Sequence, residues 1–459
     1  MSDILFVLLT ALFIGIAAIM IVRKTDSKLT FFFIGTLALF TVTLITGNSV
    51  LGEDTTGNIY VDVIDVIRIK FVSQVKGTGI RLMIVASYVS LMTHIKASKV
   101  LAAAVAKVLV KLRKPYMILG GAFIAGCILK IFITSQVSLG LLFMATIFPI
   151  LISLGVSKLS ATVVLIAIGM MDWGPNDSSA IFGATDVLGV TPMEFFLNYE
   201  IYVCVAVIVV MAIFYAVYFK YMDKKEFGES AATQTIDASS FSPRDYGVPL
   251  FYGFFPLIPL ILVIAGNITS VNFDIITANV IGFFIVFICE LIVNKNVQIL
   301  GDHLKNVFEW MGKFFTNVVV LMVAAAVFAE AIKQLKGIDI ITGWISHMTG
   351  ATLIAMVMLS VLILATAILT GSGQAPWMAF GPLTPNIASV LGINTAALAI
   401  PMHLTGGIAR CCSPFCAGVI AISGVAEVEI GDVVKRNIVP MLVAYVTQLV
   451  ATYIIFVIM

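Results

Sequence analysis

The chain has 459 residues, of which 60% are hydrophobic and only 11% are charged, and its formal net charge is +2. Soluble globular proteins are about half apolar and about a quarter charged, so this composition excludes a soluble enzyme. The balanced charge, without a basic block, gives no support for a nucleic-acid partner. We therefore predict an all-α polytopic membrane protein embedded in the lipid bilayer.

The predicted crossings follow from the apolar runs, because a membrane-spanning helix needs about 20 mainly apolar residues. The first run is too long for a signal-peptide core and has no small-residue cleavage site after it, so we expect a retained span. The predicted crossings lie at 4–22, 29–46, 79–95, 159–188, 197–220, 249–267, 273–294, 314–335, 395–426 and 437–458.

Two further apolar stretches, 115–154 and 351–392, are too long for one crossing. Small polar residues interrupt each near its middle, at 134–136 (Thr-Ser-Gln) and at 370–374 (Thr-Gly-Ser-Gly-Gln). Clusters of Lys and Arg mark cytoplasmic loops. All the Lys and Arg clusters fall on the cytoplasmic side only if both stretches enter the membrane and return to the same side, as re-entrant hairpins. The first hairpin would then enter from the inner side and the second from the outer side.

A polar segment at 222–247 divides the chain almost in half, and we expect it to be a cytoplasmic linker. Laying 134–200 over 370–438 aligns the two polar interruptions and brings Pro175 near Pro414. A chance match between apolar segments is the alternative to an internal repeat.

We interpret 1–221 and 248–459 as two inverted-topology repeats, each with five crossings and one re-entrant hairpin. Each repeat also contains one broken helix, at 159–188 in the first and at 395–426 in the second. Inverted repeats with broken helices are typical of secondary transporters, whose substrate site lies near the bilayer midplane.

The helix breaks are the predicted functional site. Backbone that leaves a helix at membrane depth cannot bond to lipid, so it indicates a cavity lined by water or ligand. Half-helices that begin after a break point positive dipole ends at the cavity, which suits an anion. The predicted substrate-binding residues are Thr134, Ser135, Gln136, Asn176, Asp177, Ser178, Thr370, Gly371, Ser372, Gly373, Gln374, Arg410, Ser413 and Lys130.

Arg410 is the most informative residue of this set. A guanidinium at the midplane costs roughly 3 kcal/mol or more unless it is paired or solvated. Its planar fork matches a carboxylate, so we predict that Arg410 binds a carboxylate of the substrate. The alternative is an ion pair with Asp172 or Asp177, and the two interpretations are compatible in different transport states.

Lys130 lies four residues before the first interruption, inside an apolar run. It is a second candidate ligand for a carboxylate. It could also stand where a coupling sodium ion would otherwise sit, neutralising Asp177. The third interpretation is a lysine whose head group reaches water.

Three residues are candidates for coupling, with Na⁺ or H⁺ as the possible coupling ion. Asp172 and Asp177 could carry a proton, coordinate Na⁺ or bind a substrate ammonium group, and the sequence does not choose among these. His403 is a possible proton carrier, and its alternative role is that of a neutral hydrogen-bonding residue in a helix.

No resident cofactor or structural metal is expected. Cys411, Cys412 and Cys416 lack the spacing of paired metal ligands, so we interpret them as small packing residues. Trp173 and Trp377 lie near the breaks, and we expect them to pack or gate rather than to bind ligand.

Several motifs together resemble the DcuC-type anaerobic C4-dicarboxylate carriers of the ion-transporter superfamily. These motifs are Ala-Thr-Ile-Phe-Pro at 145–149, Leu-Gly-Val-Ser at 154–157, Thr-Gly-Ser-Gly-Gln-Ala-Pro at 370–376, Gly-Ile-Asn at 392–394, Arg410 with Ser413-Pro414, and 433–440. The resemblance implies an elevator mechanism, in which a transport domain slides against a scaffold domain, usually within a homodimer. It also implies substrates such as succinate, fumarate and malate.

The first repeat departs from the family pattern. Its hairpin tip lacks the expected Ser-Ser-rich sequence. Its broken helix contains more acidic residues than expected, Asp172 and Asp177, and Lys130 is also unexpected. These departures leave the substrate and the coupling ion open.

The sequence thus predicts a secondary transporter of C4-dicarboxylates in the bacterial cytoplasmic (inner) membrane, and not an enzyme. It would work by exchange or by cation-coupled transport. The alternative is an amino-acid carrier of the same fold, for zwitterionic or basic substrates, because an aspartate beside an arginine suits a zwitterion. A channel is disfavoured because it does not need paired inverted hairpins. An intramembrane aspartyl enzyme is disfavoured because its two candidate acids, Asp172 and Asp177, lie in one segment.

Overall fold

The computed structural model describes residues 3–23, 25–109, 114–227, 247–268, 274–337, 339–340, 343 and 350–458, and every regular element in these ranges is a helix. The prediction of an all-α membrane protein is confirmed, because seven helices of this part are long and apolar enough to cross a membrane. These helices are Ser27–Thr46, Ile59–His94, Pro192–Glu226, Ile275–Asn294, Val297–Gln334, Ala351–Thr370 and Ile430–Ile458.

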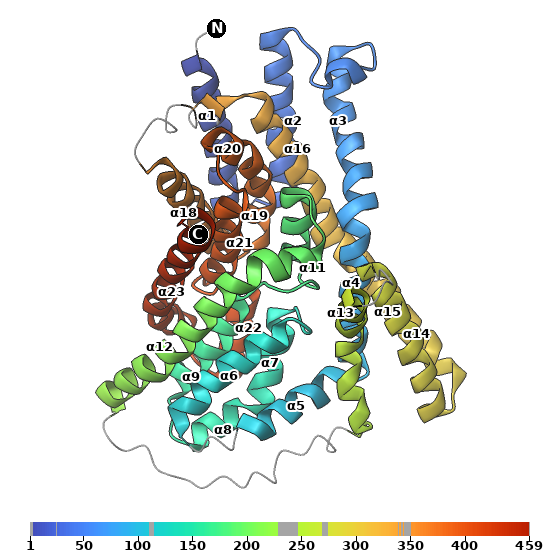
Figure 1. The fold of residues 1–459 in the computed structure, drawn as a ribbon, viewed down its shortest axis with the longest axis vertical. Helices are drawn as coiled ribbons and strands as arrows, with labels where there is room; N and C mark the ends of the chain where they lie inside the picture. The colour runs from blue at the N-terminus through green and yellow to red at the C-terminus, as the bar shows by residue number, and fades with distance from the viewer. Residues whose placement is uncertain are drawn as a thin grey trace.

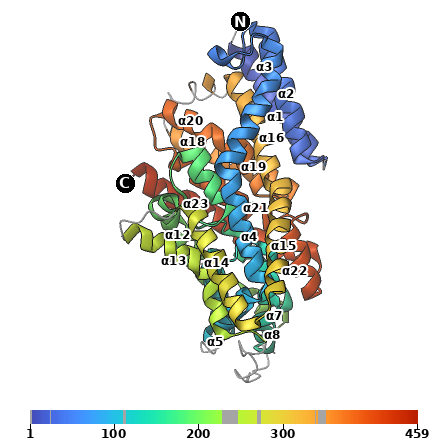
Figure 2. The same ribbon diagram turned by 90° about the vertical axis from the view of Figure 1, so that its right-hand side faces the viewer.

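Two long helices cross the molecule side by side (Figures 1 and 2). One joins α3 (Ile59–Gln74) to α4 (Ile80–His94), and the other joins α15 (Val297–Phe314) to α16 (Val320–Gln334). A π-helical turn lies in the middle of each, at Val75–Gly79 and Phe315–Val319. Each helix is about 55 Å long, well beyond the roughly 30 Å of a bilayer core. α3 packs on α16 and α4 on α15, so the two run antiparallel.

These long helices correct the predicted crossings at 79–95 and 314–335, which covered only one half of each. The acidic segment 47–62, without Lys or Arg, is expected to lie on the outer side of the membrane, and its last residues are helical because α3 begins at Ile59. The halves that escaped prediction, α3 and α15, each contain several charged side chains, which lower their average hydropathy below that of an ordinary crossing.

The first predicted hairpin is built from helices too short to cross a bilayer alone. It consists of α6 (Pro115–Lys130), α7 (Gln136–Thr146) and α8 (Phe148–Ser153), and the predicted tip falls in the gap between α6 and α7. The Ser135 side chain caps α7 by accepting a hydrogen bond from the Ser138 amide at 3.2 Å. The amphipathic segment before it is α5 (Ala97–Leu109).

Both predicted broken helices are present. The first stops after α9 (Lys158–Ala167) and a 3₁₀ turn at Ile168–Met170, and resumes as α10 (Ser178–Phe182) and a π-helical turn at Gly183–Leu188. The second stops after α21 (Ala396–Arg410) and resumes as α22 (Ala417–Ala426). The breaks coincide with Pro175 and Pro414, each of which removes a backbone donor.

The second predicted hairpin is larger than the first. Its first arm, α18 (Ala351–Thr370), has 20 residues and is long enough to cross alone, whereas the return arm is divided into α19 (Gln374–Phe380) and α20 (Thr384–Leu391). The remaining α-helices of the described residues are α1 (Asp3–Val22), α2 (Ser27–Thr46), α11 (Pro192–Phe195), α12 (Ile201–Phe227), α13 (Ile258–Ile268), α14 (Ile275–Asn294) and α23 (Ile430–Tyr453). Short 3₁₀ segments lie at Gly52–Asp54, Leu250–Leu257 and Gly381–Leu383, and π-helical turns at Phe196–Glu200 and Ile454–Ile458.

The predicted linker 222–247 begins later than expected, because α12 continues to Phe227. The rest of the linker, 228–246, lies outside the described residues.

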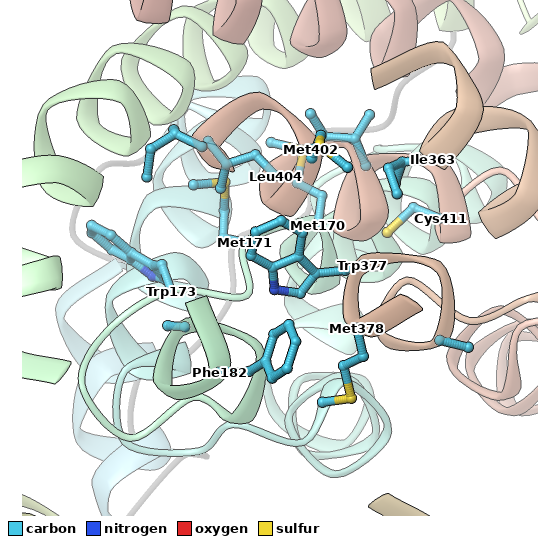
Figure 3. Packing of buried hydrophobic residues seen from close by; sticks show 14 of the residues in the cluster. Met170, Met171, Trp173, Phe182, Ile363, Trp377, Met378, Met402, Leu404 and Cys411 are labelled. Carbon is cyan, nitrogen blue, oxygen red and sulfur yellow. The ribbon is translucent and has the colours of Figure 1, made fainter. Parts of the chain in front are cut away.

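The two broken helices pack directly on each other at the centre of the molecule. A Cβ atom on Gly407 of α21 would lie 2.1 Å from the Met170 carbonyl oxygen, so this close approach requires glycine. Trp377 of α19 is buried in the same core, with its ring centroid 5.8 Å from that of Phe182 (Figure 3). Its indole Nε1 donates to the Ser179 carbonyl at 3.0 Å, which ties the second hairpin to the first broken helix.

Candidate functional site

A cavity of about 240 Å³ lies where the first hairpin tip and both broken helices meet the long helices. One wall is polar and the opposite wall, from α4 and α15, is apolar and aromatic. The lining residues are Leu82, Val85, Ala86, Thr134, Ser135, Gln136, Asp172, Asn176, Asp177, Ser178, Trp310, Phe314, Gln374 and Arg410.

Lys130 is the hub of a buried ionic network behind the polar wall. Its Nζ donates to Asp172 Oδ1 at 2.9 Å and to Asp177 Oδ2 at 3.3 Å. The side chain is 0% exposed, so the interpretation of a lysine reaching water is wrong. The interpretation that its ammonium neutralises Asp177 agrees with this geometry, and the contact with Asp172 is additional.

Arg410 extends this network from the second half of the chain. Its Nη2 donates to Asp172 Oδ1 and to the Gly169 carbonyl, each at 2.6 Å. The predicted ion pair with Asp172 is therefore present. Arg410 also lines the cavity, and its Nε is buried without a hydrogen-bond partner among the described residues. The guanidinium thus retains a donor that is not satisfied by the protein.

The hairpin tips reach the broken helix of the opposite half. Gln374 Nε2 from the second tip donates to Ser178 Oγ, in the first broken helix. From the first tip, Gln136 Oε1 accepts from Cys416 Sγ at 3.5 Å, in the second broken helix. Each half of the chain therefore supplies groups that position the other half around the cavity.

Some predicted substrate-binding residues do not line the cavity. Gly371 and Gly373 are packing positions: a Cβ would lie 2.6 Å from Phe415 backbone at the first and 2.5 Å from Gly406 backbone at the second. Ser413 is fully buried and accepts from the Phe415 amide. Thr370 Oγ1 accepts from the Ser372 amide, so these side chains shape the second tip rather than face the cavity.

Glu200 is a buried acid that sequence reasoning missed. His403 Nε2 lies 2.9 Å from Glu200 Oε1, and both side chains are fully buried. Glu200 Oε2 accepts from the Gly174 amide at 2.9 Å, within the first break. The pair therefore fixes the backbone that carries Asp172 and Asp177. The only sequence signal was a single acid at the start of an apolar run.

A second cavity of about 280 Å³ continues from the first along the long helices. The two cavities form one path, because they share the lining residues Ala86, Thr134, Ser135, Trp310 and Phe314. The aromatic residues of this path were missed because α15, apart from Phe314 at its end, lies outside the predicted crossings. The second cavity is lined by Ala86, Val89, Ser90, Thr93, His94, Thr134, Ser135, Ser138, Asn306, Trp310 and Phe314.

The cysteines and tryptophans near the breaks are buried. Cys411, Cys412 and Cys416 are buried and free. In the part of the chain that the structure describes, no group of three or more His, Cys, Asp or Glu is arranged to hold a metal ion. Trp173 is buried, and its Nε1 donates to the Cys127 carbonyl at 2.8 Å.

Solved transporter structures share this fold. The YdaH transporter of Alcanivorax borkumensis superposes with a TM-score of 0.62 at 14% identity, covering 94% of this chain and 98% of its own. MtrF of Neisseria gonorrhoeae, described as one of a class of antimetabolite efflux pumps, gives 0.61 at 9% identity, covering 96% and 97%. At these identities the likeness extends to the fold alone.

Sequence relatives are closer. The anaerobic C4-dicarboxylate transporter DcuC of Escherichia coli K12 is 30% identical, over 92% of this chain and 90% of its own length. The probable anaerobic C4-dicarboxylate transporter DcuC of Vibrio cholerae is 32% identical, over 91% and 90%. A model of the DcuC family, C4-dicarboxylate anaerobic carriers, matches residues 2–457. The chain is therefore a multi-pass protein of the inner membrane and belongs to the DcuC family of transporters.

Proposed function

We propose that this protein is a secondary active transporter that moves C4-dicarboxylates such as succinate, fumarate and malate across the cytoplasmic membrane, by exchange or by cation-coupled transport. The observation that carries the proposal is the cavity between the two broken helices, with Arg410 in its wall. The names of the relatives, anaerobic C4-dicarboxylate transporters, support this substrate class.

The cavity has the parts that bind a small carboxylate. In our proposal the guanidinium of Arg410, which lines the cavity, binds one carboxylate. The second carboxylate, or another polar end of the substrate, bonds to hydroxyl and amide groups of the hairpin tips and the first break. Those groups are Thr134, Ser135, Gln136, Asn176, Ser178 and Gln374. The carbon chain then packs on Trp310 and Phe314.

We propose an elevator mechanism within two inverted-topology repeats. The pattern of elements supports this division, because each half has one broken helix and one long helix with a central π-helical turn. The long helices would be the scaffold, which supplies the apolar wall of the cavity. The hairpins and broken helices, tied together by Arg410 and Trp377, would move as the transport domain. We also propose that the protein forms a homodimer through its scaffold domain.

The coupling step would use the buried ionic groups. Asp172 and Asp177 are the proposed sites where a proton or Na⁺ would exchange, with His403 and Glu200 behind them. Because the Lys130 ammonium already contacts both aspartates, we favour a site in which lysine takes the place of a sodium ion.

Counterflow in proteoliposomes tests the proposed function. External unlabelled succinate should drive efflux of labelled succinate from liposomes that contain the purified protein. A channel would dissipate the gradient without this trans-acceleration. If no C4 substrate, with or without an amino group, drives counterflow under any cation condition, the proposed function is wrong.

A further inference from the structure

The charges around the cavity point to a more specific substrate chemistry, and this inference rests on the proposed function because it concerns the same site. Of the three charged residues that line the cavity, Asp172 and Asp177 are acidic and Arg410 is basic. The eleven other lining residues are uncharged. Acidic residues therefore outnumber basic residues on the surface that would contact a ligand.

Lys130 balances this excess but is not available to a ligand. Its side chain is fully buried, and its Nζ is engaged by both aspartates. With all four groups ionised, the network sums to zero charge. A dianion such as succinate would then add two negative charges to a desolvated, electrically neutral site. Burying an uncompensated charge in this way is costly.

Asp177 has capacity for a further donor. An ionised carboxylate has about four lone-pair positions. Asp177 Oδ1 accepts from the Ser179 amide at 2.8 Å, and Oδ2 accepts from Lys130 at 3.3 Å, longer than the 2.7–2.9 Å usual for charged pairs. An ammonium group arriving from the cavity would complete this coordination.

Arg410 and Asp177 stand at opposite ends of one chain of contacts, in the order Arg410, Asp172, Lys130, Asp177. At one end the Arg410 side chain, which is 13% exposed, lines the cavity, and at the other end the Asp177 carboxylate lines it. We propose that the preferred substrates are C4 α-amino acids, whose carboxylate binds Arg410 and whose ammonium group binds Asp177. The ammonium supplies the positive charge that a simple dicarboxylate lacks.

Three C4 compounds of similar size separate the possibilities. Succinate has two carboxylates, L-aspartate adds an ammonium group, and L-asparagine has one carboxylate and an ammonium group. The test is counterflow in proteoliposomes with each labelled compound, in buffers with and without Na⁺ and at two pH values. We expect L-aspartate or L-asparagine to reach half-maximal exchange at a concentration at least about tenfold below that of succinate, a difference of 1.4 kcal/mol.

Asp177→Asn tests the assigned partner. It removes the charge that attracts the ammonium, so the preference for the amino compounds over succinate should fall at least about tenfold. Asp432→Asn is the matched control, because the Asp432 side chain is 59% exposed at the start of α23. It should leave the ratio unchanged. If Asp177→Asn does not fold, as judged by gel filtration, the ranking of the three compounds by the unmodified protein decides alone.

Succinate that binds as well as the amino compounds, or better, overturns this inference and leaves the proposed transport of C4-dicarboxylates standing. A requirement of succinate for Na⁺ or for the lower pH would then identify a co-bound cation as the compensating charge. An unchanged preference in a folded Asp177→Asn protein also overturns it. Failure of all three compounds, and of fumarate and malate in the same assay, overturns the proposed function as well.

Discussion

The guanidinium of Arg410 lies 2.6 Å from the Asp172 carboxylate, a contact that joins the two broken helices across 238 residues of sequence. The same Asp172 oxygen accepts from Lys130, so one carboxylate holds a cation from each half of the chain. A substrate carboxylate that binds Arg410 must share or replace this contact. The pair is therefore placed to couple substrate binding to the packing of the two halves.

Arg410→Lys should lower uptake of the transported C4 compound at least about tenfold. Lysine keeps the positive charge but loses the planar fork, and losing one charged hydrogen bond costs about 1.5–3 kcal/mol. Initial rates in proteoliposomes at several substrate concentrations measure the effect. Arg68→Lys, at a side chain that is 67% exposed and paired with Asp65, should transport normally. Near-normal uptake by Arg410→Lys would argue against a direct role in binding.

Lys130→Ala should create a dependence on Na⁺ that the unmodified protein lacks. The substitution leaves Asp172 and Asp177 without their shared ammonium, and breaking a buried ion pair costs about 3–5 kcal/mol. The variant should melt at a lower temperature without Na⁺, and Na⁺ should restore part of both stability and uptake. Lys158→Ala, at a side chain that is 56% exposed, is the control. Strict Na⁺ dependence of the unmodified protein would contradict this interpretation of Lys130.

Glu200→Ala should destabilise the protein by about 2 kcal/mol or more and reduce uptake. It leaves the Gly174 amide and His403 buried without their partner, and each unsatisfied group costs about 1–3 kcal/mol. Glu200→Gln keeps an acceptor oxygen and should recover much of the loss. Thermal unfolding in detergent measures both variants, with Glu309→Ala on the exposed face of α15 as the control. Equal stability of all three variants would show that Glu200 does not hold the backbone of the first break in place.

Gly407→Ala should abolish or strongly reduce transport. The new methyl group would lie 2.1 Å from the Met170 carbonyl oxygen, which forces the two broken helices apart. Overpacking of this kind typically costs about 1–3 kcal/mol and shifts backbone. Gly424→Ala, where nothing lies within 4 Å of the added carbon, should fold and transport normally. Full activity of Gly407→Ala would mean that this contact is not needed for a functional site.

The breaks in the helices could be read from the sequence because their signals are local. In a membrane protein, prolines and runs of small polar residues inside an apolar stretch indicate a helix break beside a cavity. Arg410 and Lys130 stood out for the same reason, since an unpaired charge is costly there. The residues around Pro175 and Pro414 were thus located correctly, together with the position of the first hairpin tip.

The other parts of the site depend on contacts that no local pattern contains. Glu200 meets His403 across 203 residues, and only the packed structure brings them together. Trp310 and Phe314 line the cavity from α15, whose charged residues left 297–313 outside the predicted crossings. Conversely, Gly373 and Ser413 match the family motif but serve packing, because small residues at a helix break suit close backbone contact as well as ligand binding.

A structure with bound substrate tests the central claim most directly. Cryo-electron microscopy of the protein in lipid nanodiscs, with a saturating concentration of whichever C4 compound drives counterflow, would locate the ligand. We predict ligand density between the broken helices, within hydrogen-bonding distance of Arg410 and the first hairpin tip, and against Trp310. Ligand density elsewhere, with this cavity holding only water, would contradict the account.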